Sequence, residues 1–289
     1  MLDRHYSIGV DVGGTKIAGV LFGGETVGKG RVLADYALGT PHDNFEHFLI
    51  MLTSVIDPLL EKAKKEKAKV RGVGLGVAGM VNRQNGKVLK APNLPYLDKV
   101  DLVGRLEKKI GLPVKIDNDA SCFLRAEARI GAGKNFQSLY GVTIGTGIGG
   151  AWWVNKNIYE GLHGVTGEPG HVIVDYKEAA DLEDIYKKLM QNNPAQLAGE
   201  AYSGDLLAEK SYEEFGRYMG IAFANIVNLI DPEAIVIGGG VVESSDLFFS
   251  SLKKSLNTFV LPPANKKIRV LKSKLGRDAG AIGAALLIS

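Results

Sequence analysis

The sequence has 289 residues and a single cysteine, Cys122. One cysteine cannot form a disulfide within its own chain, and it cannot supply the several thiolates of a cysteine-based zinc site. A strong excess of one charge is also missing, because 35 basic and 32 acidic side chains leave a formal net charge of +3. That balance gives no electrostatic reason to expect a nucleic-acid partner.

Long apolar runs are missing as well. The longest apolar stretch, 221–242, is interrupted by two asparagines and by Asp231-Pro232. It therefore predicts a helix, a turn and a strand that are each too short to span a bilayer. The first ten residues contain no apolar export signal. We expect no membrane partner and a cytoplasmic location.

The sequence does contain the ingredients of a globular protein. Hydrophobic residues make up 45% and charged residues 23% of the chain, which excludes a disordered one. Two runs rich in β-branched residues, 7–12 and 17–22, flank a glycine turn and predict a β-hairpin. Apolar residues three and four positions apart predict a helix from Phe45, capped by Asp43 or Asn44. The other expected elements are strands over 33–38, 70–77, 87–89, 114–116, 234–237 and 268–271 and helices over 102–110, 119–130, 182–190, 212–230, 245–259 and 279–288.

An internal repeat divides the chain. Residues 7–22 (SIGVDVGGTKIAGVLF) align without a gap with residues 139–154 (LYGVTIGTGIGGAWWV), so that Gly9 falls on Gly141 and Gly13 on Gly145. A repeat of this length indicates a duplicated domain. We expect a smaller lobe of residues 1–117 plus 276–289 and a larger lobe of residues 118–275. Because no low-complexity linker separates them, they should meet along a cleft, where ligand sites concentrate.

Three glycine turns can bring backbone N–H groups close to phosphate oxygens, because no Cβ stands in the way. They are residues 13–16 (GGTK), 145–150 (GTGIGG) and 238–240 (GGG). Each alone is compatible with a hairpin turn. The GxGxxG pattern at 145–150 precedes a strand and not a helix, and residues 13–16 lack the spacer of a Walker A loop.

Taken together, the turns and the repeat are typical of an actin-like ATPase that binds a triphosphate between two hairpins, with the third turn at a helix start. We therefore predict an α/β fold of duplicated actin-like ATPase (RNase H-like) domains, with mixed sheets flanked by helices. Asp11 lies within the first apolar strand, where a carboxylate is costly unless it is paired or near a metal. Its counterpart in the repeat is Thr143. We predict that Asp11 serves Mg²⁺, with a structural hydrogen-bonding role as the alternative.

A second polar group stands at residues 116–122 (IDNDASC), between a strand and a helix. Helix capping by Asn118 or Asp119 explains part of it. Three polar residues exceed the needs of one cap. A carboxylate at a strand end that faces the cleft is well placed as general base for an attacking hydroxyl.

At this point the chain resembles the ROK family of sugar kinases, in its glucokinase-type members. The resemblance covers nearly the whole chain and rests on motifs in the family's order, which are DVGGTK at 11–16, GVAGMVN at 76–82, APNLP at 91–95, DND at 117–119, IGTGIGG at 144–150, GEPGH at 167–171 and IGGG at 237–240. It implies Asp119 as the catalytic base, and it implies sugar contacts by Gly79, Asn93, Asn118, Asp119, Glu168 and His171. A hydrogen-bonded histidine buried in a turn is the alternative for His171.

The nucleotide side of the site then follows from the turns. The expected contacts to ATP and Mg²⁺ come from Asp11, Gly13, Gly14, Thr15, Lys16, Gly145, Thr146, Gly147, Gly239 and Gly240. A solvent-facing lysine on the hairpin is an equal alternative for Lys16.

The chain departs from the family after His171. Many members carry there a segment whose cysteines bind a structural zinc together with the histidine, whereas this chain has no cysteine in that region. Residues 180–183 (ADLE) resemble the end of that segment, with Asp181 in place of its last cysteine. Glu183 is therefore the candidate for a second sugar-binding glutamate, with Glu178 and Glu160 as competitors. We expect no bound zinc, and some other packing must order residues 172–182.

The expected activity is ATP-dependent phosphorylation of a hexose, foremost glucose at its 6-hydroxyl. Alternative sugars are fructose, mannose and an N-acyl hexosamine, and polyphosphate is an alternative donor. The family also contains sugar-responsive DNA-binding repressors with an N-terminal helix-turn-helix. Only six residues precede the first predicted strand here, so we expect no such domain. A non-catalytic sugar sensor is disfavoured by the presence of Asp11 and Asp119. We expect a homodimer or homotetramer.

Overall fold

The computed structural model describes residues 5–23, 30–262 and 268–288. Its contacts divide the chain into two compact units. Unit 1 contains residues 1–135, 157–166 and 274–289, and unit 2 contains residues 136–156 and 167–273. The lobe boundaries expected from the sequence stay a prediction. No helix in the described part of the chain is long and apolar enough to cross a membrane.

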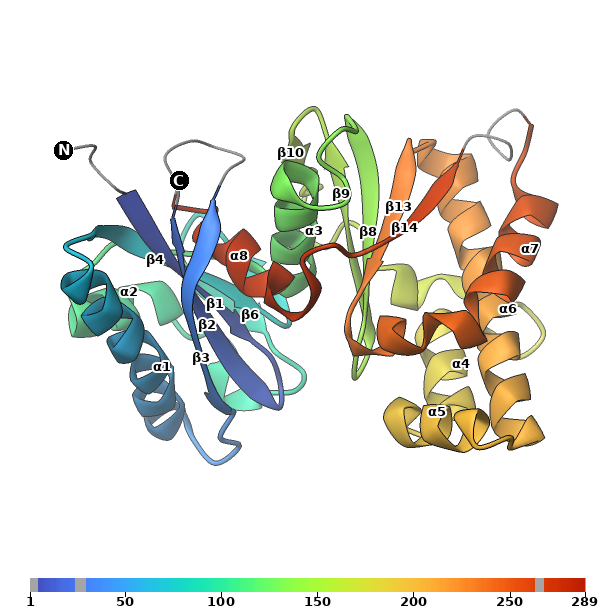
Figure 1. Ribbon diagram of the computed structural model, residues 1–289, viewed down its shortest axis with the longest axis horizontal. Helices are drawn as coiled ribbons and strands as arrows, with labels where there is room; N and C mark the ends of the chain where they lie inside the picture. Colours follow the sequence, from blue (N-terminus) through green and yellow to red (C-terminus); the bar gives the residue numbers. More distant parts are fainter. Residues whose placement is uncertain (1–4, 24–29, 263–267, 289) are drawn as a thin grey trace. The chain divides into compact units, whose positions relative to one another are not determined.

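The sheet of unit 1 has the strand order β3-β2-β1-β4-β7. Figure 1 labels β1, β2, β3 and β4 of this sheet. Its strands are β1 (His5–Val12), β2 (Lys16–Gly23), β3 (Arg31–Gly39), β4 (Lys69–Val77) and β7 (Val114–Asn118). β1 pairs antiparallel with β2 and parallel with β4, and β4 pairs parallel with β7. The sheet is therefore mixed, and three of its parallel strands end at the same edge.

Helices cover both faces of this sheet. Helix α1 (Phe45–Lys65) packs on β2 and β3, and Asn44 caps it by accepting a hydrogen bond from the His47 N–H. Helix α8 (Ala279–Ala285) packs on β1 and β4 from the other face, next to α3 (Asp119–Ile130). A Cβ on Gly9 would lie 1.9 Å from the Ala281 carbonyl oxygen, so the absence of a side chain there permits the close approach of α8.

The rest of unit 1 is built from short elements. They are the antiparallel pair β5 (Met80–Asn82) and β6 (Lys87–Lys90), helix α2 (Leu102–Ile110), the short strand β10 (Asn157–Ile158) and two 3-10 turns, Pro95–Leu97 and Gly276–Asp278. Helix α2 begins after the cap Asp101, which accepts from the Gly104 N–H, and ends at Gly111 with φ of 70°. These caps satisfy backbone groups that the helix ends leave open.

Unit 2 repeats the plan of the first sheet. It contains β9 (Ile148–Val154), β8 (Ser138–Ile144), β13 (Ala234–Gly238) and β14 (Arg269–Lys272) in this order, with β8 and β9 antiparallel and the other pairs parallel. Its core is formed with helices α4 (Leu182–Leu189), α5 (Pro194–Tyr202), α6 (Leu206–Ile230) and α7 (Phe249–Phe259). Strands β11 (Ile173–Asp175) and β12 (Ala180–Asp181) form a separate hairpin, and the 3-10 helices are Pro169–His171 and Gly240–Leu247.

Most predicted elements are confirmed, and the differences have local causes. The strand predicted over 114–116 continues to Asn118, because polar residues at its end still pair with β4. The helix predicted over 245–259 starts at Phe249, after a 3-10 helix, and α6 starts at Leu206 because Asp205 caps it there. The gap-free repeat alignment holds only for the first strands. Val12 pairs with Ile17 but Ile144 with Ile148, so the second turn is one residue shorter.

Candidate active site

The polar candidates of unit 1 gather where its parallel strands end. Asp11 on β1, Gly76 on β4 and Asp117 on β7 are register partners across three neighbouring strands. Helix α3 follows directly on β7 at Asp119. The carboxyl ends of parallel strands are where open α/β sheets bind ligands. The fold thus brings Asp11, Asn118 and Asp119 to one edge of the sheet.

Asp11 is partly buried at this edge. The pKa of its carboxyl is raised to about 7, chiefly by burial and also by the nearby Asp119 carboxylate, while Lys16 lowers it. A Cβ added to Gly280 would lie 2.6 Å from Asp11 Oδ2, so α8 contacts the carboxylate closely. Asp11 is therefore a carboxylate that lacks adequate solvation, and an added cation would stabilise its charged form.

Asn118 and Asp119 have separate tasks. Asn118 caps α3, since its Oδ1 accepts from the Ser121 N–H at 3.1 Å, and its amide nitrogen donates to the Gly79 carbonyl at 3.1 Å. Asp119 is the first residue of the helix, and its carboxylate has hydrogen bonds with the backbone of the helix start and with the Asn118 side chain. Burial raises the pKa of Asp119 above its usual value, against the hydrogen bonds of the helix start. The structure thus brings Gly79, Asn118 and Asp119 together, and their contacts to a sugar stay a prediction.

The first glycine turn lies beside this group. The Gly13 N–H donates to the Lys16 carbonyl at 3.0 Å, and the Thr40 hydroxyl donates to the Gly13 carbonyl at 2.8 Å. A Cβ on Gly14 would lie 2.9 Å from Asn93 Cβ, so the predicted sugar neighbour Asn93 packs directly on the turn. Thr15 and Lys16 are exposed.

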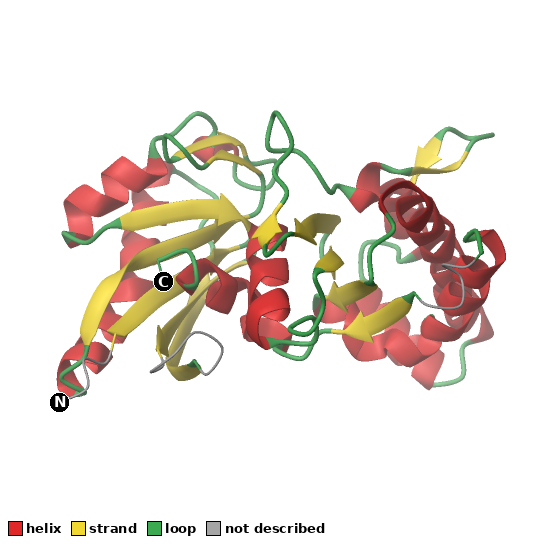
Figure 2. Ribbon diagram, turned by 90° about the horizontal axis from the view of Figure 1, so that it is seen from above, coloured by secondary structure: helices red, strands yellow, loops and turns green. Residues whose placement is uncertain are grey.

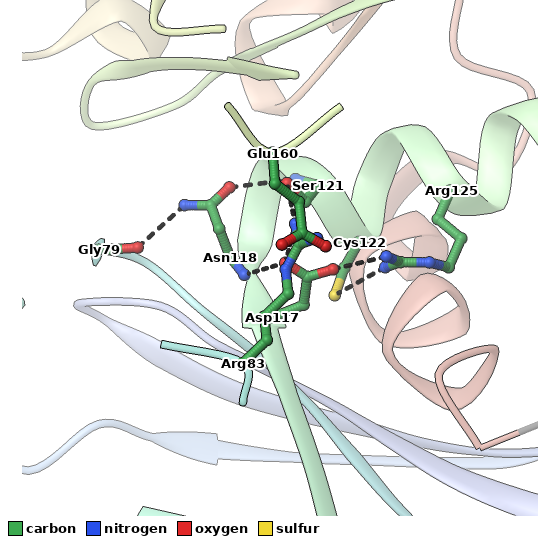
Figure 3. A network of polar contacts seen from close by, with 8 residues as sticks. All are labelled: Gly79, Arg83, Asp117, Asn118, Ser121, Cys122, Arg125 and Glu160. Carbon is green, nitrogen blue, oxygen red and sulfur yellow. Dashed lines mark hydrogen bonds and ion pairs between the residues drawn. The ribbon is translucent and has the colours of Figure 1, made fainter. Parts of the chain in front are cut away.

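A cluster of ionic side chains around Asp117 was not predicted from the sequence. Asp117 is 0% exposed and forms ion pairs with Arg83 and Arg125, each at 2.6 Å. Arg83 also pairs with Glu160 (Figure 3). The excess of polar residues in 116–122 signals that one of them has another partner, but no spacing in the sequence identifies that partner.

In unit 2 the second glycine turn is held by helix α4. The Gly145 N–H donates to the Gly147 carbonyl at 2.9 Å, and the Tyr186 hydroxyl donates to the Gly145 carbonyl at 2.5 Å. Glu183 Oε2 accepts from the Ile148 N–H at 2.8 Å, and its other oxygen pairs with Lys187 at 2.6 Å. The structure therefore places Glu183 against this turn, with Thr146 exposed at the tip.

His171 and Asp181 are in contact at the two ends of the segment that follows the GEPGH motif. His171 Nδ1 and Asp181 Oδ2 are 3.0 Å apart, and Asp181 caps α4 by accepting from the Asp184 N–H. The hydrogen bond to Asp181 raises the pKa of His171. The chain between them forms the β11–β12 hairpin, and the Leu182 N–H donates to the Val172 carbonyl. His171 is exposed and not a buried turn residue, and Glu168 just before the 3-10 turn is exposed too.

The third glycine turn follows β13. Gly239 has φ of +92°, and a Cβ there would lie 2.2 Å from the Ile144 carbonyl oxygen, so only glycine fits. Gly240 starts the 3-10 helix, and both residues are exposed. Across the described residues, no group of three or more His, Cys, Asp and Glu side chains is arranged to hold a metal ion.

Comparison with known proteins identifies the family of the chain. The ROK family model matches residues 7–184 and 178–289. The chain belongs to the ROK family. It is 30% identical to a glucokinase of Halalkalibacterium halodurans over 100% of the chain and 96% of that protein. Among solved structures it is similar to a ROK family glucokinase from Streptomyces griseus in complex with glucose and AMPPNP, with a TM-score of 0.81, 28% identity and 98% of each chain covered.

The chain is also similar to ROK proteins that are not called glucokinases. A xylose repressor of Bacillus spizizenii is 27% identical over 98% of the chain and 77% of its own length. An N-acetyl-D-glucosamine kinase of Mannheimia succiniciproducens is 29% identical over 96% of the chain and 98% of that protein. The actin-like α/β fold predicted from the sequence is thereby confirmed, and sugar kinases are among the relatives.

Proposed function

We propose that this ROK protein transfers the γ-phosphoryl group of ATP to a hydroxyl of a hexose, with glucose at its 6-hydroxyl as the first candidate. The observation that carries the proposal is the placement of Asp119, a helix-start carboxylate that is not used as the cap and that lies near a second carboxylate and a glycine turn. The similarity to glucokinases, one of them solved with glucose and an ATP analogue, supports it.

Asp119 acts as general base in this proposal. Its raised pKa makes it a better proton acceptor than an exposed carboxylate. The proton of the sugar hydroxyl passes to Asp119 as the sugar oxygen attacks the γ-phosphorus, and the bond to the β,γ-bridging oxygen breaks. Asn118, Gly79 and Asn93 are the sugar contacts proposed in unit 1, and Glu168 and His171 those proposed in unit 2.

The glycine turns are the proposed phosphate contacts, because their N–H groups can face anionic oxygens. Asp11 fits a Mg²⁺ role, since an under-solvated carboxylate is an oxygen ligand that this hard cation prefers. Bound Mg²⁺ would neutralise charge on the phosphate oxygens. Within the chain itself, Lys16 on the first turn supplies a positive charge near Asp11.

ADP formation from MgATP tests the proposal. The purified protein would be assayed against glucose, mannose, fructose and N-acetylglucosamine, with polyphosphate as an alternative donor and a no-sugar control. We expect sugar-dependent ADP formation that is fastest with glucose. Faster turnover of N-acetylglucosamine would favour an N-acyl hexosamine kinase, which the Mannheimia relative makes the second candidate. Sugar binding by calorimetry without turnover of any sugar would indicate a sensor instead.

A further inference from the structure

The carboxylate of Asp117 is held from two sides inside unit 1. Arg125 Nη2 lies 2.6 Å from its Oδ2, and the Arg83 guanidinium lies 2.6 Å from its Oδ1. The Asn118 N–H donates to the same Oδ1 at 2.7 Å. Each oxygen of a fully buried carboxylate thus has a charged partner (Figure 3). We call Arg83, Asp117 and Arg125 the Asp117 clamp.

The clamp joins the end of a strand to the helix that follows it. Asp117 lies on β7, while Arg125 lies on α3, eight residues further along. Arg83 reaches Ser121 Oγ at 3.3 Å as well, in the first turns of α3. Between these anchor points stand Asn118 and Asp119. Their backbone is therefore held on the strand side by Asp117 and on the helix side by Arg125.

Arg83 also extends the clamp to a third chain segment. It follows β5 directly and pairs with Glu160, whose side chain is 55% exposed, in the 157–166 segment of unit 1. Two arginines thus face two carboxylates, and the charges of the cluster balance. The clamp arginines are much less accessible than Glu160, with side chains 22% and 10% exposed for Arg83 and Arg125.

Stability alone is a weak reason for such a cluster. Taking charges out of water is expensive, and apolar replacements of a buried ion pair are often as stable or more so. Paired charges in such a clamp supply a defined geometry. The planar guanidinium donates its hydrogen bonds in fixed directions, so the carboxylate can occupy only certain positions. A general base must be held within a fraction of an ångström of its working position.

We propose that Arg83 and Arg125 are positioning residues, which fix Asp117 and thereby the backbone that presents Asn118 and Asp119 to the sugar hydroxyl. This inference rests on the proposed function for the role of Asp119. The positioning itself is a property of the chain and can be measured without any substrate.

Three variants of one helix test the clamp. Arg125→Met removes the guanidinium at similar length, and Arg125→Lys keeps a charge but loses the planar fork. Arg129→Met is the matched control, because Arg129 lies one turn further on α3, is partly buried and takes no part in the contacts to Asp117. Circular dichroism melting selects an assay temperature at which all three are folded.

Turnover separates positioning from stability. We expect kcat with the preferred sugar to fall about 10- to 100-fold in Arg125→Met, the loss typical of a misplaced catalytic group, while KM for ATP stays within about twofold. Arg125→Lys should recover part of kcat, and Arg129→Met should match the wild type. A wild-type kcat in Arg125→Met, with only its melting temperature lowered, would reduce the clamp to a structural element and overturn the proposal.

Amide hydrogen exchange of residues 117–122 tests the same point without sugar or nucleotide. Faster exchange there in Arg125→Met, and not in Arg129→Met, is the expected result even if the wild type phosphorylates no hexose. In that case the proposed function fails and the positioning role stands. Equal exchange at 117–122 in all variants would overturn the positioning role, whatever the activity of the wild type.

Discussion

At the scale of single residues, burial and helix capping give neighbouring polar side chains different partners. Three acidic or amide side chains follow one another at 117–119, and each meets a different fate. Asp117 forms ion pairs with two arginines, and Asn118 caps helix α3. Burial raises the pKa of Asp119. The division of labour at this strand end therefore follows from hydrogen bonding and not from the residue types alone.

The first prediction concerns Asp119. Asp119→Ala should lower kcat of sugar phosphorylation by roughly 10²- to 10⁴-fold, because the proton of the attacking hydroxyl loses its acceptor. Coupled-enzyme measurement of ADP formation checks this, with Asp35→Ala on the exposed side of β3 as the control that should keep wild-type rates. A turnover within threefold of wild type in Asp119→Ala would remove Asp119 from the mechanism.

The second prediction concerns the pH dependence that Asp11 imposes on the ligand-free protein. Its pKa rises from 3.8 to about 7 on folding, so the folded state favours the protonated carboxyl. Its contribution to stability is therefore complete below about pH 4 and is lost as pH rises through about 7. Asp11→Asn cannot ionise. Its free energy of unfolding relative to wild type should increase by about 2–4 kcal/mol between pH 4 and pH 8.

Urea unfolding at several pH values, without Mg²⁺ and nucleotide, measures this difference for Asp11. A difference between variant and wild type that stays flat from pH 4 to pH 8 would mean that Asp11 ionises normally in the folded chain.

At the scale of elements, several contacts of the candidate site join residues that are far apart in the sequence, and no local pattern predicts these contacts. The first hairpin, helix α1 and the longer strands follow from local patterns, and the sequence predicts them. The Arg83–Asp117 contact joins residues 34 positions apart. The contact between Glu183 and the Ile148 N–H spans 35 positions. Such pairs depend on how elements pack, and no local pattern specifies them. Helix α5 is not predicted from the sequence for another reason, because its nine residues include few large apolar side chains.

The third prediction concerns the contact of α4 with the second glycine turn. Glu183→Leu leaves the Ile148 N–H without its acceptor, so KM for ATP should rise about 10-fold while KM for sugar changes little. Glu183→Gln keeps an acceptor oxygen and should stay near wild type. The exposed Glu178→Gln is the control. A rise of KM for sugar in Glu183→Gln, with KM for ATP unchanged, would instead support the sugar-ligand role predicted from the sequence.

At the scale of the whole molecule, the internal repeat explains why a few short motifs predict the architecture of both units. Each unit has a glycine-turned hairpin next to parallel strands, with β1, β4 and β7 matched by β8, β13 and β14. The two hairpins differ in one position that bears on the site. Asp11 of the first hairpin corresponds to Thr143 of the second, so the carboxylate is not required by the fold. The repeat accounts for the shared architecture and for the shared glycine turns, while Asp11 is present in the first copy alone.

The last prediction concerns the metal content of the purified chain. A structural zinc site needs four ligands, three of them cysteines in the segment that many ROK proteins carry, and this chain has only Cys122, which is buried on α3. In place of a metal, the β11–β12 pairing and the His171–Asp181 hydrogen bond hold the segment after His171. Elemental analysis should therefore find well under one zinc per chain, and EDTA should leave the melting temperature unchanged. Asp181→Ala should lower the melting temperature even though no metal is lost, because the hairpin then loses its bond to His171 and α4 loses its cap. About one zinc per chain, removed by EDTA with a fall in melting temperature, would show that other side chains have taken over the cysteine positions.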